Sequence, residues 1–391
     1  MTVGAAWSWP DPRVDGELKA RLMIALGERL CALLEGIPPG DPLEIGEQIV
    51  ALGHSEAERL RTEMGIATEV PHLAVLVVTS VFDAAVHDAF GRALGRPVWD
   101  CYGPEFLNRD LSAYLDEQFR GEYPDRYTLR RPTSPLPLYH LVGALDPLTA
   151  SDVEKPVGDG YPETLAEWIE RDGLTHLKIK LNGQDLKWDV ERVLAVDAVA
   201  SETAGGREWQ YSLDFNETCP DVEYLVEALK KMQEGSPAAF RRIQYIEQPT
   251  ARDLFAPGAF AMHEAAKLKP VVIDESLVDY ESLLRARELG YTGVALKACK
   301  GQSQSLQMAA AALKHGMFLC VQDLTCPGRA FAWSAALAAR IPTVAAVEGN
   351  ARQYAPAASR AWAERLPGLF TVRAGRIDPS GLTSPGLGYG D

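Results

Sequence analysis

Three acidic residues in the second half of the chain each end a short apolar run. Asp214, Glu247 and Asp274 follow runs rich in β-branched and aromatic residues, which is typical of buried strands. Carboxylates that lie close together repel one another unless a cation neutralises them. Because ligands made only of oxygen suit a hard ion, we expect these three residues to bind Mg²⁺, or Mn²⁺ in its place. The alternative is three unrelated acids that face solvent at strand ends.

Lysines end other apolar runs of the same kind. Lys178 and Lys180 lie two residues apart, so a strand would point both side chains in the same direction, and Lys297 ends a further run. A single lysine at a strand end is usually a surface charge. A bound metal and a neighbouring ammonium group, however, both favour the neutral amine and lower the pKa of a lysine. These residues therefore predict a base that removes a proton beside a metal ion.

The segments that carry these residues alternate regularly between predicted helix and predicted strand from residue 165 onward. After a first strand in the run 136–143, the predicted strands end at Lys180, Asp214, Glu247, Asp274, Lys297, Asp323 and Glu348. Alternating strands and helices favour a parallel sheet. Eight such units predict an α/β fold, a (β/α)₈ TIM-type barrel, with its site at the carboxyl ends of the strands. An open doubly wound sheet is the alternative, but the sequence contains no GxGxxG or Walker motif.

The remaining segments predict a smaller domain around the barrel. Helical periodicity before the barrel indicates a mainly helical capping domain over residues 1–110, with residues 1–13 as an irregular arm. Residues 111–115, directly after this domain, predict a strand. We expect the barrel to span 111–365 and a tail, 366–391, to form a small hairpin and pack on the cap. The segment 116–135 is polar, aromatic and long for a connection, so it predicts a lid over the carboxyl ends of the strands.

Composition limits the kinds of partner. The chain has 391 residues, 47% hydrophobic and 24% charged, which is ordinary for a soluble globular protein of one large and one smaller domain. Its formal charge of −15 argues against nucleic acid and against an anionic membrane surface. No apolar run looks long enough to span a bilayer, and no secretion signal begins the chain. The six scattered cysteines predict reduced thiols in the cytoplasm.

Five motifs at these strand ends resemble those of a known family. The motifs are Lys178-Ile-Lys180, Asp214-Phe-Asn216, Glu247-Gln-Pro249, Asp274-Glu275-Ser276 and Lys297-Ala-Cys-Lys300. In this order and at barrel spacing they resemble the enolase superfamily, in particular its muconate-lactonizing (muconate cycloisomerase) subgroup. Residues 81–91 are similar to that family's link between cap and barrel, and residues 384–388 to its C-terminal segment. The resemblance covers roughly residues 75–391.

The resemblance implies a role for each motif. Asp214, Glu247 and Asp274 would bind Mg²⁺, Lys180 and Lys297 would act as acid and base on opposite faces of the substrate, and Lys178 would assist electrostatically. Such an enzyme takes the α-proton from a small carboxylate substrate and leaves a metal-stabilised enediolate. The resemblance also implies a homo-oligomer. The residues expected to bind the rest of the substrate are Asn216, Asp323, Glu348 and Arg329, with the arginines of 120–131 as further candidates for an anionic group.

Two departures from the family bear on the reaction. Residues 1–13 leave no room for the three-stranded meander that normally begins the cap, and the seventh strand ends without the histidine of the mandelate racemase branch. A lysine on each face favours a racemase or epimerase. A cycloisomerase, or a lyase that dehydrates a hydroxy or sugar acid, uses the same first step. A catalytically silent metal-binding barrel is the alternative from another class, but a structural metal site needs no neighbouring base.

Overall fold

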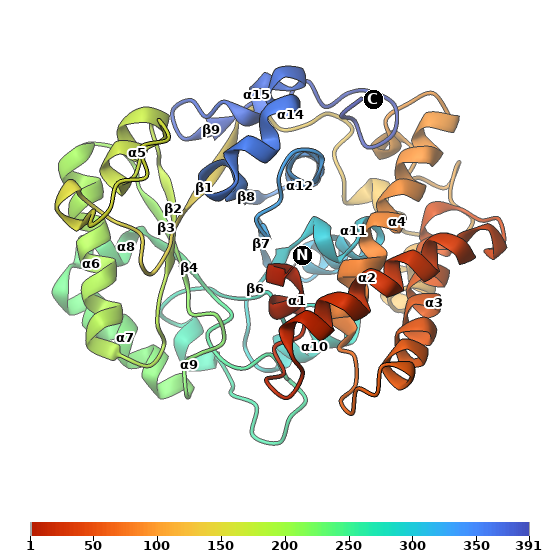
Figure 1. Ribbon diagram of the computed structural model, residues 1–391, viewed down its shortest axis with the longest axis horizontal. Helices are drawn as coiled ribbons and strands as arrows, with labels where there is room; N and C mark the ends of the chain where they lie inside the picture. Colours follow the sequence, from red (N-terminus) through yellow and green to blue (C-terminus); the bar gives the residue numbers. More distant parts are fainter. Residues whose placement is uncertain (1, 391) are drawn as a thin grey trace.

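The computed structural model describes residues 2–390 and contains a closed barrel of parallel strands (Figure 1). The strands are β1 (Leu136–Val142), β2 (His176–Lys180), β3 (Gln210–Asp214), β4 (Ile243–Glu247), β5 (Val271–Ile273), β6 (Gly293–Leu296), β7 (Phe318–Val321) and β8 (Val344–Glu348). Each strand pairs in parallel with the next, and β1 pairs with both β2 and β8, which closes the ring. The predicted TIM-type barrel is therefore confirmed.

Helices connect the strands on the outside of the barrel. They are α5 (Leu165–Asp172), α6 (Leu186–Thr203), α7 (Val222–Gly235), α8 (Pro237–Arg242), α9 (His263–Ala266), α10 (Tyr280–Glu288), α11 (Gln302–Lys314) and α12 (Arg329–Arg340). Asp185, Asp221 and Asp279 begin α6, α7 and α10 by accepting a hydrogen bond from a backbone N–H of the first turn. Because each helix returns the chain to the start of the next strand, all carboxyl ends lie on one side of the ring.

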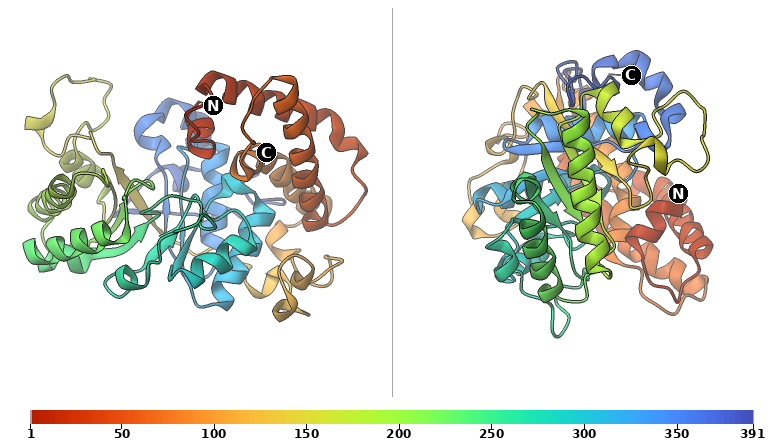
Figure 2. Two further views of the ribbon diagram at one scale, coloured as in Figure 1. Left: turned by 90° about the horizontal axis from the view of Figure 1, so that it is seen from below. Right: turned by 90° about the vertical axis from the view of Figure 1, so that its left-hand side faces the viewer.

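The N-terminal part is helical, as expected for a cap. It comprises α1 (Thr2–Ser8), α2 (Gly16–Leu33), α3 (Pro42–Glu63) and α4 (His72–Ala93). Leu22, Leu26, Leu30 and Val75 form part of its own apolar core. Figure 2 shows α2–α4 at the opposite end of the molecule from α5–α8, whereas α1 lies nearer the middle. The expected irregular arm thus contains a helix, α1.

Helix α4 qualifies the expectation that no segment could span a membrane. By length and composition alone α4 could do so, although 56% of its most apolar window is buried inside the protein. Two of its polar residues are also buried against the barrel, where Asp83 Oδ2 accepts a hydrogen bond from Ser303 N (2.9 Å) and His87 Nε2 lies 2.9 Å from Ser303 Oγ. The core helix of a soluble protein meets the same criteria as a membrane span.

The segment before β1 does not have the predicted position. Leu129 N and Thr133 N donate hydrogen bonds to the carbonyl oxygens of Arg340 and Ala339 at the C-terminal end of α12. This end of α12 precedes β8, so it lies by the amino ends of the strands. Lys314, the last residue of α11, likewise contacts Gln118 O and Glu122 Oε2. The lid predicted over the carboxyl ends at 116–135 is therefore wrong. The physical reason is connectivity, because the segment must deliver the chain to the start of β1 at Leu136.

Of two smaller predictions, the strand at 111–115 is wrong, whereas the small hairpin in the tail is present, because Arg373 N and Arg376 N each donate a hydrogen bond to the carbonyl oxygen of the other residue. Residues 111–115 contain a short 3₁₀ helix, Leu111–Ala113, instead of a strand, because the Asp110 side chain accepts a hydrogen bond from Ser112 N and favours a turn. The tail contains α13 (Ala351–Tyr354), α14 (Arg360–Arg365), α15 (Pro367–Phe370) and β9 (Arg376–Ile377). The last strand pairs antiparallel with the start of β1. Near the C-terminus, Gly386 O accepts a hydrogen bond from Val98 N just after α4 (2.7 Å).

Candidate active site at the carboxyl ends of the strands

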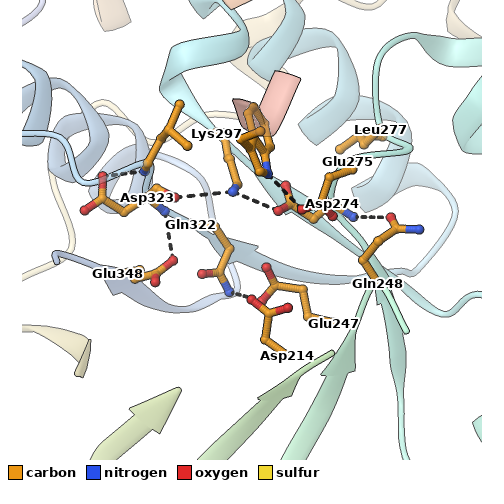
Figure 3. A network of polar contacts seen from close by, with 12 residues as sticks. Asp214, Glu247, Gln248, Asp274, Glu275, Leu277, Lys297, Gln322, Asp323 and Glu348 are labelled. Carbon is orange, nitrogen blue, oxygen red and sulfur yellow. Dashed lines mark hydrogen bonds and ion pairs between the residues drawn. The ribbon is translucent and has the colours of Figure 1, made fainter. Parts of the chain in front are cut away.

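The barrel brings the predicted lysines and carboxylates to one ring. Lys180, Asp214 and Glu247 are the last residues of β2, β3 and β4, and the strand register pairs Lys180 with Asp214 and Asp214 with Glu247. Asp274 and Lys297 directly follow β5 and β6. Figure 3 shows Asp214, Glu247, Asp274 and Lys297 together at this end of the barrel.

Lys178 lies at the centre of the ring among three carboxylates. Its side chain is 2% exposed, and its Nζ lies 2.8 Å from Glu247 Oε1, 3.0 Å from Asp214 Oδ2 and 3.3 Å from Glu348 Oε2. Burial acts to lower the pKa of Lys178, but the carboxylates raise it well above the ordinary value. Lys178 is therefore an ammonium ion in this arrangement, which agrees with the electrostatic role that the resemblance implies for it.

Lys297 lies on another side of the ring and is also buried. Its Nζ is 2.7 Å from Asp274 Oδ2 and donates a hydrogen bond to Asp323 O at 3.3 Å. Burial acts to lower the pKa of Lys297, but Asp274 raises it overall. Lys297 is thus also protonated while it contacts Asp274. A neutral amine here requires that another cation offset the charge of Asp274.

Lys180 is the more open of the two predicted acid/base residues. Its side chain is 24% exposed, contacts Asp214 Oδ2 and donates a hydrogen bond to Asn216 Oδ1 at 2.9 Å. The backbone after β3 is strained, with φ of 46° at Asn216 and 67° at Glu217, a region that few residues other than glycine adopt. Strain of this kind is typical of functional sites, and here it holds the Asn216 amide beside the lysine.

The three predicted metal ligands offer the oxygen atoms that Mg²⁺ prefers, but their present positions do not form a site for one ion. Asp214, Glu247 and Asp274 are all buried, and they follow three neighbouring strands. Burial acts to raise the pKa of Asp214 and of Asp274, but the lysines lower it in both. Within residues 2–390, however, no three His, Cys, Asp or Glu side chains are grouped so that they could hold one ion. The Lys178 amine contacts Asp214 and Glu247 instead, so a shared ion would require this amine to move.

Two glutamines, which the sequence analysis did not identify, position these charged groups. Gln322 Oε1 accepts a hydrogen bond from Lys178 Nζ (3.0 Å), and Gln322 Nε2 donates one to Glu247 Oε2 (2.9 Å). Gln248 Oε1 accepts hydrogen bonds from Asp274 N (3.0 Å) and Ser276 N (3.2 Å). Gln248 has a φ of 31°, a further strained residue at a strand end. Their places directly beside Glu247 and Asp323 were the one indication available from sequence.

Of the residues expected to bind the rest of the substrate, Asp323 and Glu348 join the ring and Arg329 does not. Glu348 Oε2 accepts a hydrogen bond from Asp323 N at 3.0 Å, and burial together with Glu348 raises the pKa of Asp323 to about 6. Arg329 is exposed and stacks on the rings of Trp362 and Tyr389, 5.4 and 5.8 Å from their centroids. The arginines of 120–131 lie with the segment that is remote from the ring. Arg120 pairs with Glu117 and Arg126 pairs with Glu122, so these arginines, like Arg329, have partners away from the ring.

The N-terminal arm covers part of the ring, which the sequence analysis did not foresee. The Trp7 indole ring lies under Lys297 Nζ, 4.4 Å from its centroid, and Trp7 Nε1 donates a hydrogen bond to Glu275 Oε1 at 2.8 Å. Arg252 Nη1 donates a hydrogen bond to Trp7 O at 3.0 Å. Glu275 is buried, and burial, Asp274 and Glu217 raise its pKa to about 7. Helix α1 therefore closes the Lys297 side of the site.

Comparison with known proteins agrees with this architecture. A family model described as enolase C-terminal domain-like matches residues 161–390. No curated protein matches the chain. Among solved structures, an enolase from Bradyrhizobium complexed with magnesium and mandelic acid is similar, with a TM-score of 0.59, 18% identity and coverage of 94% of this chain and 79% of that one.

Two further solved structures have the same degree of identity. A muconate lactonizing enzyme from Klebsiella pneumoniae has a TM-score of 0.52 at 18% identity, covering 85% of this chain and 75% of that one. A racemase from Streptomyces coelicolor A3(2) with bound magnesium has a TM-score of 0.51 at 18% identity, covering 88% and 78%. At this identity the likeness shows a shared fold.

Proposed function

Because the chain belongs to the enolase superfamily, we propose that it is a Mg²⁺-dependent enzyme that removes the α-proton of a carboxylate substrate and returns a proton to the opposite face. It would thus act as a racemase or epimerase. The observation that carries the proposal is the position of two lysines on the ring. Lys180 ends the second strand and Lys297 follows the sixth strand of an eight-stranded barrel, so their amines flank the three carboxylates from opposite sides.

Each lysine would serve as base in one direction and as acid in the other. The amine that lacks its proton removes the α-proton, and the opposite ammonium delivers one to the other face. Lys180 is partly exposed and can exchange its proton with water, whereas Lys297 is shielded by Trp7. Reprotonation on the opposite face needs both amines, which is why their placement favours inversion over loss of a leaving group.

Asp214, Glu247 and Asp274 would hold the metal ion, since they are buried oxygen donors on adjacent strands. When bound, Mg²⁺ would stabilise the negative charge that develops on the substrate carboxylate. Lys178 would then contribute its positive charge at the centre of the ring, where Gln322 holds it. Two of the similar structures, those from Bradyrhizobium and Streptomyces coelicolor, are described with magnesium, which supports this choice of ion.

The proposal is tested by incubating the protein with Mg²⁺ and a library of chiral carboxylates in D₂O. We expect at least one substrate to gain deuterium at the α-carbon and to lose optical activity, and a chelator should stop both. Lys231→Ala is the control variant, because Lys231 lies on α7 and pairs with Glu227 on the surface. Absence of exchange with every member of the library, or exchange that persists with the chelator, would overturn the proposal.

A further inference from the structure

A cleft lies by the amino ends of the strands, at the opposite end of the barrel from the ring. It has a volume of about 580 Å³, which is the size of a small-molecule site. Figure 2 shows residues 100–130, drawn in light orange, on the far side of the barrel from α1. Four arginines line this cavity, and we call it the arginine cleft. They are Arg96, Arg130, Arg131 and Arg340.

The arginines of the cleft have no acidic partner. Within residues 2–390, none of the four forms an ion pair with a carboxylate. By contrast, Arg120 and Arg126, from the same segment before β1, each pair with a neighbouring glutamate. Guanidinium groups that share one cleft repel one another, and an anion between them relieves this repulsion. The part of the arginine-rich segment that has no partner of its own therefore lies where it can bind an anion.

Arg340 forms the floor of the arginine cleft. Its side chain is 1% exposed, and its guanidinium donates hydrogen bonds to Leu129 O (3.3 Å), to Arg130 O and to Leu382 O (2.9 Å). These acceptors are neutral carbonyl oxygens, so they do not neutralise the charge of the buried guanidinium. The same contacts tie the chain that carries Arg130 and Arg131 to this floor, which places both exposed side chains at the rim.

Arg96 and two aromatic rings form the opposite wall. The Arg96 guanidinium stacks on Phe106, 5.2 Å from the ring centroid, and the Arg340 guanidinium lies 5.9 Å from the centroid of Trp99. A guanidinium that stacks on a ring keeps the N–H groups along its edge available to a carboxylate or phosphate. Pro97 and Pro104 add apolar surface to the lining. Such walls fit a ligand that has an organic body as well as an anionic group.

Acids in the lining limit the charge that the ligand can carry. Asp100, Glu105 and Asp125 also line the cleft, so four arginines face three acids. The remainder of the chain is acidic, with a formal charge of −15 for the whole protein. A polyanion such as nucleic acid would meet these negative charges beyond the cleft. A small anion touches only the arginines, so the cleft favours a ligand with one or two negative charges.

We propose that the arginine cleft is a binding site for a small organic anion that carries a phosphate or carboxylate group, which Arg96, Arg130 and Arg131 hold above Arg340. The lining contains none of the lysines or metal-ligand carboxylates of the ring. Binding in the cleft is therefore independent of Mg²⁺, and the ligand is not the substrate of the proposed reaction. This inference does not depend on the proposed function.

The test measures binding to the full chain by calorimetry, without Mg²⁺ and at low salt. The probes are phenyl phosphate, benzoate, inorganic phosphate and neutral benzamide. We expect wild type to bind phenyl phosphate or benzoate roughly tenfold or more tightly than benzamide, because charged hydrogen bonds contribute most of the affinity. The tighter of the two aromatic anions identifies the anionic group. Added salt should weaken the binding of both.

Variants assign this binding to the cleft. The double variant Arg130→Gln/Arg131→Gln should lose roughly tenfold or more in affinity for the preferred anion, since it removes two charged donors. Arg96→Gln should also weaken binding. Arg21→Gln is the matched control, because Arg21 is an exposed arginine of α2 that does not line the cleft. The control should bind as wild type does.

Three outcomes would overturn the inference. Equal binding of benzamide and the anions would mean that the cleft does not recognise charge. Undiminished affinity in the double variant would place the bound anion elsewhere on the protein. Affinity no tighter than that for chloride would mean an adventitious ion only. Because α-proton exchange does not enter this test, failure of the proposed function would leave its result unchanged.

Discussion

The two sides of the candidate site differ in how they are covered. On the β2–β3 side, Lys180 is 24% exposed and bonded to Asn216, which is itself exposed. On the β5–β6 side, Lys297 is 4% exposed and lies against Trp7 of the N-terminal arm. Both lysines occupy equivalent strand ends of a nearly symmetric ring. The difference therefore arises outside the barrel, from a helix that reaches one side only, and it separates a solvent-accessible acid/base group from a shielded one.

The largest effect is expected from replacing Glu247, which ends β4 between the β2–β3 side and the β5–β6 side. Glu247→Ala should abolish Mg²⁺ binding and α-proton exchange, because it removes one of three oxygen donors and leaves Lys178 without its nearest partner at 2.8 Å. Calorimetric titration with Mg²⁺ measures the first effect. The circular dichroism spectrum should stay native, since the apolar residues pack the barrel. Wild-type Mg²⁺ affinity in this variant would mean that Glu247 does not bind the metal ion, and the proposed metal site would be wrong.

Removing each lysine tests whether both sides take part in the reaction. Lys297→Ala should stop turnover of one stereoisomer, with a loss in kcat of roughly 10²–10⁴-fold, and leave α-proton exchange of the other through Lys180. Lys180→Ala should show the mirror pattern. Deuterium incorporation into each stereoisomer, followed by NMR, measures both. Near wild-type turnover in Lys297→Ala would mean that the shielded lysine has no acid/base role.

Opening the covered side tests the role of the arm. Trp7→Ala should raise the reactivity of Lys297 toward an amine-modifying reagent by several-fold and leave that of Lys180 unchanged, because the indole lies against Lys297 and Lys300, which both follow β6. Peptide mass spectrometry after brief modification gives both reactivities in one sample. Trp7→Phe is the matched control, since it keeps a ring over Lys297 and loses only the N–H to Glu275. Equal reactivity of the two lysines in wild type would contradict the comparison itself.

The smallest effect is expected where the lid was predicted from sequence. Arg120 pairs with Glu117 on the surface, with side chains 73% and 76% exposed, and lies in the segment remote from the ring. Arg120→Ala should change KM less than twofold and the free energy of unfolding by less than about 1 kcal/mol. Steady-state kinetics and urea denaturation measure these. A large rise in KM would instead mean that the segment 116–135 takes part in substrate binding.

Much of the ring was predictable from the sequence, and the exceptions have a common cause. Lys180, Asp214, Glu247 and Lys297 could be placed because each ends a local apolar run, and parallel strands bring such ends together. Gln248 and Gln322 were missed because a glutamine beside an acid has no distinctive pattern. Their roles depend on hydrogen bonds to other strands.

By itself, the sequence determined the order of the strands and the residues at their carboxyl ends, since strand and helix periodicity are local properties of the chain. Tertiary structure alone decided which segment covers the ring. Residues 116–135 had the composition of a lid, yet connectivity to β1 holds them by the opposite ends of the strands. The cover is Trp7, whose hydrogen bond to Glu275 joins residues 268 positions apart. A contact over that separation depends on how the helical cap packs on the barrel, which no local pattern encodes.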